Sequence, residues 1–463
     1  MRNTKLIYVI ALLLIFCMGA APQKQANSNP FNADAHAGKH VQADIPPTGA
    51  GVIQHVIIIM QENRSPDNLF HGLPNADIAN SGLDHKGNKV TLLPQSLANN
   101  YDLGHSHNSF VVMYDNGKMD GADKIQQFCD PISPTALCVN AGAYPQYKYV
   151  NPSDVTSYFQ LAEQYGFGDR MFQTNQGQTY PAHQFILAGT SAPTANSNLY
   201  VAESPEGNSF PGVHTGCAAQ PIQTVALINP QGQEKQKIYP CFEHATLPDL
   251  LDAKGISWRY YTPTAGGLGT GPNSIRHLRF GPDWKEDVIP DQTQVLRDIA
   301  QGRLAGVSWV IPTRISSDHP GTSDGSGPAW VTSIVNAVGN SSYWSSTAIF
   351  IIWDDWGGWY DHVAPTIYDQ YTYGFRVPLI VVSPYIVSPG YVSHVKHDFG
   401  SILKFTEDVF GLPSLGYADS RADNLSDFFN FSNQGTAFHP IPARYDQNYF
   451  LNDKRKPMDP DDD

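Results

Sequence analysis

Four short runs of apolar residues stand out along the chain, and none of them alternates with polar positions. They occupy residues 55–60 (HVIIIM), 305–312 (AGVSWVIP), 347–353 (TAIFIIW) and 376–384 (RVPLIVVSP). Continuous runs of this kind, rich in β-branched residues, are typical of strands buried on both faces, as in a parallel sheet covered by helices. The pattern therefore predicts four strands of one central sheet.

Helices are predicted between and after these runs, at residues 180–188, 329–338 and 398–410. Strands that alternate with helices indicate an α/β, doubly wound architecture. The sequence has no internal repeat and no sign of a second domain. We therefore expect one large domain at residues 51–450, followed by a solvated, charged tail at residues 451–463.

Two of the predicted strands run directly into residues that carry side-chain oxygens. The first run leads into Glu62 and Asn63, and the third leads into Asp354 and Asp355. Ligands bind at the carboxyl ends of strands in open α/β sheets, and carboxylate and amide oxygens suit a hard or borderline divalent cation. The pattern predicts a shared metal site. The alternative is that these side chains cap helices or face solvent.

A Gly-x-Thr turn precedes the first predicted helix and ends at Thr179, with Pro181 in the first helical turn. Proline there is a helix-start signal, and the amides and dipole of a helix N-terminus favour an anionic oxygen and a nearby phosphate. A hydroxyl becomes a good nucleophile only when a metal or base lowers its pKa. Thr179 is therefore a candidate nucleophile beside the predicted cation. The alternative is that it only caps the helix.

The chain has 16 histidines, and several lie in loops beside Gly, Asp or Pro, among them His105, His277, His319 and His362. Imidazoles can donate hydrogen bonds to phosphate oxygens and protonate a leaving alkoxide. A single histidine in a loop is as a rule an ordinary surface residue. These positions become candidates only together with the metal and the hydroxyl.

Composition and charge narrow the class of protein. The 463 residues are 41% apolar and only 16% charged, which excludes wholesale disorder. The formal net charge is −14, without a basic patch, so nucleic acid is not expected as a partner. An acidic protein that handles phosphate needs a bound cation or focused positive groups at the site.

The N-terminus has the pattern of an export signal. Arg2 and Lys5 precede an apolar run at residues 6–18, and small residues follow at 19–21. We expect a signal peptide at residues 1–21, a flexible leader at residues 22–50, and a mature protein that is secreted or periplasmic without a permanent membrane span. The alternative, a retained membrane anchor, needs about 20 apolar residues.

Four cysteines remain when the signal is removed: Cys129, Cys138, Cys217 and Cys241. An even number in an exported protein suggests two disulfides, for which three connectivities exist. The pairing favoured here joins neighbours along the chain, Cys129 with Cys138 and Cys217 with Cys241. Four free thiols are the alternative.

Six sequence blocks together resemble one protein family. They are HVIIIMQENRSPDNLF, YDLGHSHNS with YDNGKMDGA, YGFGDRMFQTNQGQTYPAHQFILAGTS, WDDWGGWYDHVAP, YGFRVPLIVVSPY and KHDFGSILKFTEDVFGLP. From about residue 53 to about residue 430, and in this order, they resemble the bacterial phosphoesterase family that holds the phospholipases C and a related acid phosphatase. The resemblance implies the alkaline phosphatase superfamily, and hence an alkaline-phosphatase-like three-layer α/β sandwich with a mostly parallel central sheet.

The resemblance also implies roles for individual residues. It makes Thr179 the nucleophile and a ligand of one divalent metal ion, for which Ca, Mg, Mn, Fe or Zn are open. His362 and His397 are implied in supporting positions. The remaining implied metal ligands are Glu62, Asn63, Asp354 and Asp355. The implied catalytic and substrate-binding residues are His105, His277 and His319, and Asn63 is implied as a further substrate contact.

The expected function is that of an exported, metal-dependent phosphoric ester hydrolase that works through a covalent phosphothreonine. Pro66 stands where the family usually has an aromatic residue, and the C-terminal repeats of larger phospholipases C are missing. Both departures favour an acid-phosphatase-like monoesterase. The alternatives are a phospholipase C acting on phospholipid head groups, a glycoside hydrolase with Glu62 and Asp354 as paired carboxylates, and a non-catalytic binder.

Overall fold

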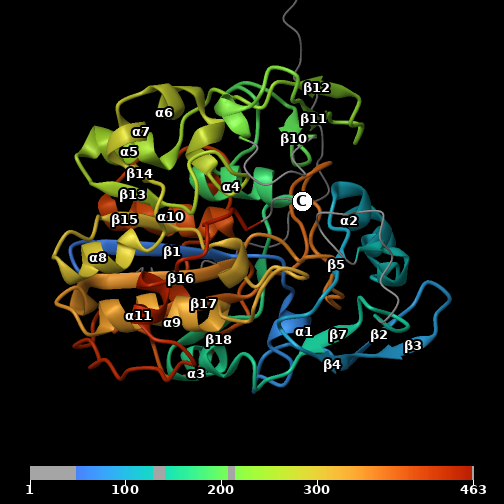
Figure 1. Ribbon diagram of the computed structural model, residues 1–463, viewed down its shortest axis with the longest axis horizontal. Coiled ribbons are helices and arrows are strands. Elements are labelled where there is room, and N and C mark those ends of the chain that lie inside the picture. Colours follow the sequence, from blue (N-terminus) through green and yellow to red (C-terminus); the bar gives the residue numbers. More distant parts are fainter. Residues whose placement is uncertain (1–47, 129–140, 207–213, 461–463) are drawn as a thin grey trace, which may run out of the picture. The chain divides into compact units, whose positions relative to one another are not determined.

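An eight-stranded sheet lies at the centre of the fold (Figure 1). The computed structural model describes residues 48–128, 141–206 and 214–460. Neighbouring strands are parallel, except that β17 runs antiparallel to both of its neighbours, β16 and β8. The expected α/β fold with a mostly parallel central sheet is confirmed. In order across the sheet the strands are β14 (Val288–Ile289), β13 (Trp258–Tyr261), β15 (Val307–Val310), β1 (His55–Gln61), β16 (Thr347–Trp353), β17 (Leu379–Val382), β8 (Gly166–Gly168) and β18 (Tyr391–Ser393).

Helices cover both faces of the sheet (Figure 1). On one face lie α4 (Thr179–Ala188), α5 (Leu247–Lys254) and α10 (Phe399–Phe410), with α4 in contact with the other two. On the other face α9 (Gly327–Gly339) contacts α3 (Thr156–Gln164), α8 (Gln294–Ala300) and α11 (Gln447–Leu451). The smaller elements are α1 (Pro66–Leu69), α2 (His107–Tyr114), α6 (Arg276–Phe280), α7 (Asp283–Glu286), β2 (Ser81–Leu83), β3 (Lys89–Thr91), β4 (Leu93–Gln95), β5 (Asp102–Leu103), β6 (Gln127–Phe128), β7 (Lys148–Val150), β9 (Met171–Phe172), β10 (Tyr200–Val201), β11 (Val225–Ile228), β12 (Gln236–Ile238) and β19 (His397–Asp398).

The four apolar runs correspond to β1, β15, β16 and β17, and the three predicted helices to α4, α9 and α10. Every residue of β15, β16 and β17 is buried, as expected for strands covered on both faces. The direction of β17 differs from the parallel arrangement that its pattern suggests. An apolar run reports burial on both faces, and burial does not depend on which way the strand runs.

The register of the parallel strands brings the ends of β1 and β16 to the same point. Gln61 pairs with Trp353, so Glu62 and Asp354 follow at neighbouring positions of the sheet edge. The backbone N–H of Glu62 donates to the carbonyl of Ser317, 2.8 Å away, in the segment that follows β15. Three neighbouring strands thus deliver residues 62–63, 317–319 and 354–355 to one edge.

Three expectations about the periphery of the fold can be compared with the structure. A disulfide joins Cys217 to Cys241, as predicted, whereas the predicted Cys129–Cys138 pair lies outside the described residues. Among the described helices, none combines the length and apolar character needed to cross a bilayer. The charged tail is exposed at residues 452–457, but Asp459 is only 3% exposed and its carboxylate accepts a hydrogen bond from the Thr264 hydroxyl.

Candidate active site

Three carboxylates and a threonine hydroxyl meet at the edge of the sheet between β1 and β16. We call Glu62, Asn63, Thr179, Asp354 and Asp355 the acidic centre; all five residues are fully buried. The Thr179 hydroxyl donates to Asp354 Oδ2 at 2.5 Å and lies 3.4 Å from Glu62 Oε2. The structure therefore brings together the metal ligands predicted from the sequence.

Backbone amides fix the orientation of Asp354. Its Oδ1 accepts hydrogen bonds from the N–H of Asn63 at 3.0 Å and of Asp355 at 2.8 Å, which leaves Oδ2 directed at Thr179. Asn63 has a left-handed backbone, with φ of 63°. This conformation costs a non-glycine residue roughly 1–2 kcal/mol, and Asn adopts it more readily than most residues.

Thr179 is the first residue of α4, and the N-cap position belongs to Gln178. The alternative that Thr179 only caps the helix is therefore wrong, because its hydroxyl bonds to Asp354 and not to a backbone amide of the helix. The α4 segment is buried throughout and ends at Gly189, which has a left-handed backbone. The packed helix holds the hydroxyl at the positive end of its dipole, where an incoming anion is favoured.

His105 and His319 both lie beside the acidic centre. His105 Nε2 is 3.2 Å from Asn63 Nδ2 and 3.8 Å from Asp355 Oδ2. The ring centroids of His105 and His319 are 6.4 Å apart, and both side chains are buried. The Nδ1 atoms lie 2.8 Å from the Leu103 carbonyl and 2.7 Å from the Pro320 carbonyl. Since a carbonyl only accepts, Nδ1 carries the proton in each neutral ring, and Nε2 carries the lone pair.

The position of His319 depends on Arg64, the residue after Asn63. The buried guanidinium donates from Nε at 3.0 Å and from Nη2 at 2.7 Å to the carbonyl of Asp318. Asp318 has a left-handed backbone with φ of 70°, and burial raises the pKa of its carboxyl to about 6. The hydroxyl of Tyr158 donates to that carboxyl at 2.7 Å. A single arginine thus ties the segment after β1 to the segment that carries His319.

Among the described residues, the contact partners of His277 lie outside the acidic centre. His277 lies on α6, with Nδ1 2.6 Å from Glu243 Oε1 and Nε2 3.0 Å from Asp249 Oδ1. The hydrogen bond to Asp249 and the second carboxylate raise the pKa of His277 to about 9. These are the contacts of a partly exposed ion pair, so a catalytic role for His277 rests on the sequence resemblance alone.

Comparison with known proteins assigns the chain to a family. A family model described as "Phosphoesterase family" matches residues 53–413, which contain every residue of the acidic centre.

The chain belongs to the phosphoesterase family.

This membership confirms the family that the sequence blocks suggest. A non-haemolytic phospholipase C of Pseudomonas aeruginosa is 24% identical over 451 residues, covering 84% of this chain and 58% of the relative. Phospholipase C B of Mycobacterium tuberculosis is 24% identical over 444 residues, covering 82% of this chain and 78% of the relative. Non-specific phospholipase C1 of Arabidopsis thaliana is 21% identical over 426 residues, covering 82% of this chain and 71% of the relative. This phosphoesterase therefore spans less than two thirds of the Pseudomonas protein.

Solved structures show a fainter likeness. A protein in the alkaline phosphatase superfamily from Vibrio parahaemolyticus aligns with a TM-score of 0.35 and 10% identity, covering 83% of this phosphoesterase and 73% of that chain. The lipoteichoic acid synthase LtaP from Listeria monocytogenes aligns with a TM-score of 0.35 and 11% identity, covering 85% and 79%. Structural similarity this low gives no information about the site.

The acidic centre of the phosphoesterase fits a divalent cation. Three carboxylates that are buried together oppose one another's ionisation unless a positive charge offsets them. Asn63 Oδ1 is also buried and accepts no hydrogen bond from the described residues. A buried amide oxygen without a donor is unfavourable in a dry site, and a metal ion removes that cost. Glu62, Asn63, Thr179, Asp354 and Asp355 are thus suitable as ligands.

One residue of the cluster was missed in the sequence. Glu62, His183 and Asp354 each offer a ligand atom, and these atoms lie within 4.8 Å of one another. His183 is fully buried on α4, four residues after Thr179, and its Nε2 is 3.7 Å from Glu62 Oε1. Residues four apart share a helix face, so the spacing was the signal that could have found it.

A cavity of about 470 Å³ opens beside the acidic centre. Its lining includes His105, Gln178 (the residue before Thr179), Lys124, Ser106 and Ser109. The cavity reaches His105 beside the acidic centre, and Lys124 brings a positive charge to its lining. It is therefore the candidate space for the part of a substrate that leaves the phosphorus.

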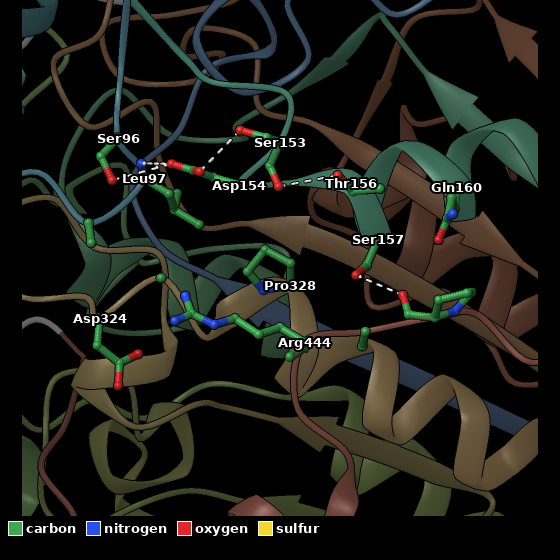
Figure 2. Close-up of a pocket in the computed structure, with 15 residues that line it drawn as sticks. Ser96, Leu97, Ser153, Asp154, Thr156, Ser157, Gln160, Asp324, Pro328 and Arg444 are labelled. Atoms are coloured by element: carbon green, nitrogen blue, oxygen red, sulfur yellow. Dashed lines mark hydrogen bonds between the residues drawn. The ribbon is translucent and has the colours of Figure 1, made fainter.

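A second pocket, of about 330 Å³, lies elsewhere and contains none of the residues of the acidic centre (Figure 2). Figure 2 shows its polar side chains bonded to one another and to the chain: Ser96 Oγ and the Leu97 N–H both donate to Asp154 Oδ2, at 3.2 and 3.0 Å. Ser157 donates to the Pro442 carbonyl at 3.1 Å. These bonds hold loops together, and the pocket has no part in the proposed chemistry.

Arg376 is the centre of a buried ion network. Its guanidinium donates to both carboxylate oxygens of Asp361, at distances from 2.9 to 3.1 Å, and to Asp67 at 3.2 Å. His362 Nδ1 lies 2.8 Å from the same Asp67. The network connects the start of β17 with α1 and with the loop after β16, so His362 has a supporting position.

His397 also holds segments together. Its Nδ1 lies 2.8 Å from Asp423 Oδ1, and its Nε2 lies 3.0 Å from Ser393 Oγ at the end of β18. The histidine is fully buried, whereas Asp423 is partly exposed. Its contacts join β18, β19 and the segment after α10, which is the supporting position implied by the resemblance.

Proposed function

We propose that this protein hydrolyses phosphoric esters by nucleophilic attack from Thr179, with one divalent ion held by the acidic centre. The observation that supports this most directly is the bond of 2.5 Å from the Thr179 hydroxyl to Asp354 Oδ2, inside a cluster of buried oxygen ligands. Family membership supports the reaction class. The Cys217–Cys241 disulfide supports an oxidising compartment, and hence export.

The residues of the site have separate tasks in this proposal. The ion, when bound, lowers the pKa of a coordinated hydroxyl and offsets the charge of the phosphate. The Thr179 hydroxyl passes its proton to Asp354 Oδ2, the acceptor of its hydrogen bond, and its oxygen attacks phosphorus. The bond from phosphorus to the leaving oxygen breaks, and a phosphothreonine forms. Protonated His105 or His319 gives a proton to the leaving alkoxide. Water then attacks the same phosphorus, which releases phosphate and restores the threonine hydroxyl.

The substrate expected from the sequence is a phosphomonoester. A second candidate is a phospholipid phosphodiester, because the relatives named above are phospholipases C. For a diester, the cavity of about 470 Å³ beside His105 receives the leaving group. p-Nitrophenyl phosphate, p-nitrophenyl phosphorylcholine and phosphatidylcholine vesicles, each assayed with and without a chelator, separate these two functions.

The test of the nucleophile compares Thr179→Ala with Thr190→Ala, since Thr190 is an equally buried threonine at the end of the same segment and outside the acidic centre. Loss of a nucleophile typically lowers kcat on the order of 10³-fold or more. We expect this loss for Thr179→Ala on every hydrolysed ester, normal rates for Thr190→Ala, and a phosphorylated wild-type peptide containing residue 179 after acid quenching. Near-normal turnover by Thr179→Ala contradicts the proposal.

Chelation tests the metal independently of the nucleophile. Removal of the ion is expected to abolish turnover, and addition of single divalent metals restores it. A glycoside hydrolase that uses two carboxylates needs no cation, so activity on glycosides that survives chelation contradicts the phosphoesterase assignment of these residues.

A further inference from the structure

His183 occupies a position that the proposed reaction does not use. It lies one turn of α4 beyond Thr179, and its ring is fully buried. Its Nε2 lies 3.7 Å from Glu62 Oε1. A buried imidazole next to a carboxylate at this position either supports the fold or binds the metal ion.

The hydrogen bonds of Tyr260 decide which nitrogen of His183 carries the proton. The Tyr260 hydroxyl donates its single proton to the Gly269 carbonyl at 2.6 Å and accepts from the Gly271 N–H at 3.2 Å. His183 Nδ1 lies 3.1 Å from the same hydroxyl oxygen. Because the hydroxyl proton is already used, Nδ1 must be the donor in this contact. The other nitrogen, Nε2, then carries the lone pair of the neutral ring.

In the neutral ring this lone pair faces a carboxylate oxygen of Glu62, an arrangement that a cation shared by the two atoms stabilises. Two donors that each lie about 2.1 Å from one ion are at most about 4.2 Å apart. The separations within this cluster are below that limit, at 3.7 Å from His183 Nε2 to Glu62 Oε1 and 3.4 Å from Thr179 Oγ1 to Glu62 Oε2. The spacing matches donors that share one ion.

We propose that His183 supplies a nitrogen ligand to the divalent ion of the acidic centre, oriented by Tyr260, and that this ligand makes the site selective for Zn²⁺, Co²⁺ or Fe²⁺ over Ca²⁺ and Mg²⁺. Imidazole suits borderline transition ions, whereas Ca²⁺ and Mg²⁺ prefer sites made of oxygen alone. The inference rests on the metal of the proposed function and extends it from an ion of open identity to a class of ions.

Metal binding to the full, metal-depleted chain tests the inference without any assay of turnover. Calorimetric titrations with Co²⁺ and with Ca²⁺ compare the wild type with His183→Leu and Tyr260→Phe, and thermal unfolding checks that each variant is folded. Even groups that only orient a ligand are typically worth 10–100-fold in affinity. We expect His183→Leu to weaken Co²⁺ binding by at least about 100-fold and Tyr260→Phe by on the order of 10-fold. Binding of Ca²⁺ is expected to change by less than about threefold.

The visible absorption spectrum of bound Co²⁺ is a second readout, because it reports the donor atoms. It is expected to change in His183→Leu and to keep its form in Tyr260→Phe. Anomalous diffraction from wild-type crystals soaked in Co²⁺ needs no variant and is expected to place the ion about 2.0–2.2 Å from His183 Nε2. Equal Co²⁺ affinity and an unchanged spectrum in His183→Leu overturn the inference, as does an ion out of reach of this nitrogen. If the wild type binds no divalent ion, the metal of the proposed function fails as well; if it binds Co²⁺ without His183, only this inference fails.

Discussion

His277 offers a test in which a structural role and a catalytic role predict opposite results. Its ring bridges Glu243 and Asp249, and these two carboxylates raise its pKa from an ordinary value of 6.5 to about 9. The substitution His277→Gln removes the positive charge and keeps a polar side chain of similar reach. If the contacts seen in the structure are the whole of its role, stability falls and turnover does not.

The size and the pH window of the effect follow from the shift in pKa. A rise from 6.5 to about 9 is equivalent to roughly 3 kcal/mol for a fully coupled group. The His277 side chain is 33% exposed and its partners 52% and 36%, so solvent screening reduces the expected contribution to about 1–2 kcal/mol. A pKa raised by folding means that the protonated form stabilises the fold. The contribution is complete below pH 6.5, declines as the pH rises through about 9, and is absent above it.

Denaturant unfolding of the wild type and His277→Gln at pH 6, 7.5 and 10 measures this window, alongside kcat on the preferred ester. We expect a stability difference of about 1–2 kcal/mol at pH 6 that disappears by pH 10, with kcat unchanged within about twofold. Glu243→Gln is the matched control, since it removes one of the two acceptors and is expected to show a smaller difference in the same window. A difference in stability that is independent of pH refutes the ion-pair reasoning, and a large loss of kcat at unchanged stability restores the catalytic role implied by the sequence.

Two further predictions concern the support of the site. Asn63→Gly and Asn63→Ala both remove an oxygen ligand and are expected to weaken divalent-metal binding in calorimetric titrations. Since φ at this residue is 63°, Asn63→Ala is expected to be less stable to heat than Asn63→Gly by about 1 kcal/mol, and the reverse order contradicts the left-handed backbone. Arg376→Met leaves the Asp361 carboxylate buried without its cation, and is expected to lower the free energy of unfolding in urea by about 3–5 kcal/mol. Adding Asp361→Asn is expected to recover part of that loss, and no recovery indicates that the arginine acts through packing instead.

The residues that could be predicted from the sequence are those whose signal is local. Glu62 and Asp354 directly follow apolar runs that form neighbouring strands, so strand burial and strand order together determine that they meet. Thr179 begins a helix whose start is marked by a turn and a proline. In each case a few consecutive residues are enough to predict the element and the position of the side chain. The parallel register of the strands then brings the segments together.

The features that could not be predicted depend on partners far away in the chain. The orientation of His183 follows from the hydroxyl of Tyr260, 77 residues later, which is itself held by the loop at Gly269. The two carboxylates that pair with His277, Glu243 and Asp249, lie 34 and 28 residues earlier in the chain. The sequence around His277 contains no pattern that predicts this pairing. Contacts of this kind are set by tertiary packing, which a short stretch of sequence does not encode.

The burial of Asp459 has a practical consequence for work with the purified enzyme. This carboxylate lies so close to Gly267 that a side chain there would collide with it, and the carbonyl of the preceding Met458 accepts from the Arg314 N–H at 3.0 Å. The loop containing Gly267 is the one whose Gly269 carbonyl anchors Tyr260. An affinity tag or fusion partner joined soon after residue 460 would therefore be attached next to the loop that contacts Tyr260. Handles for purification or immobilisation belong between the expected signal peptide and residue 48.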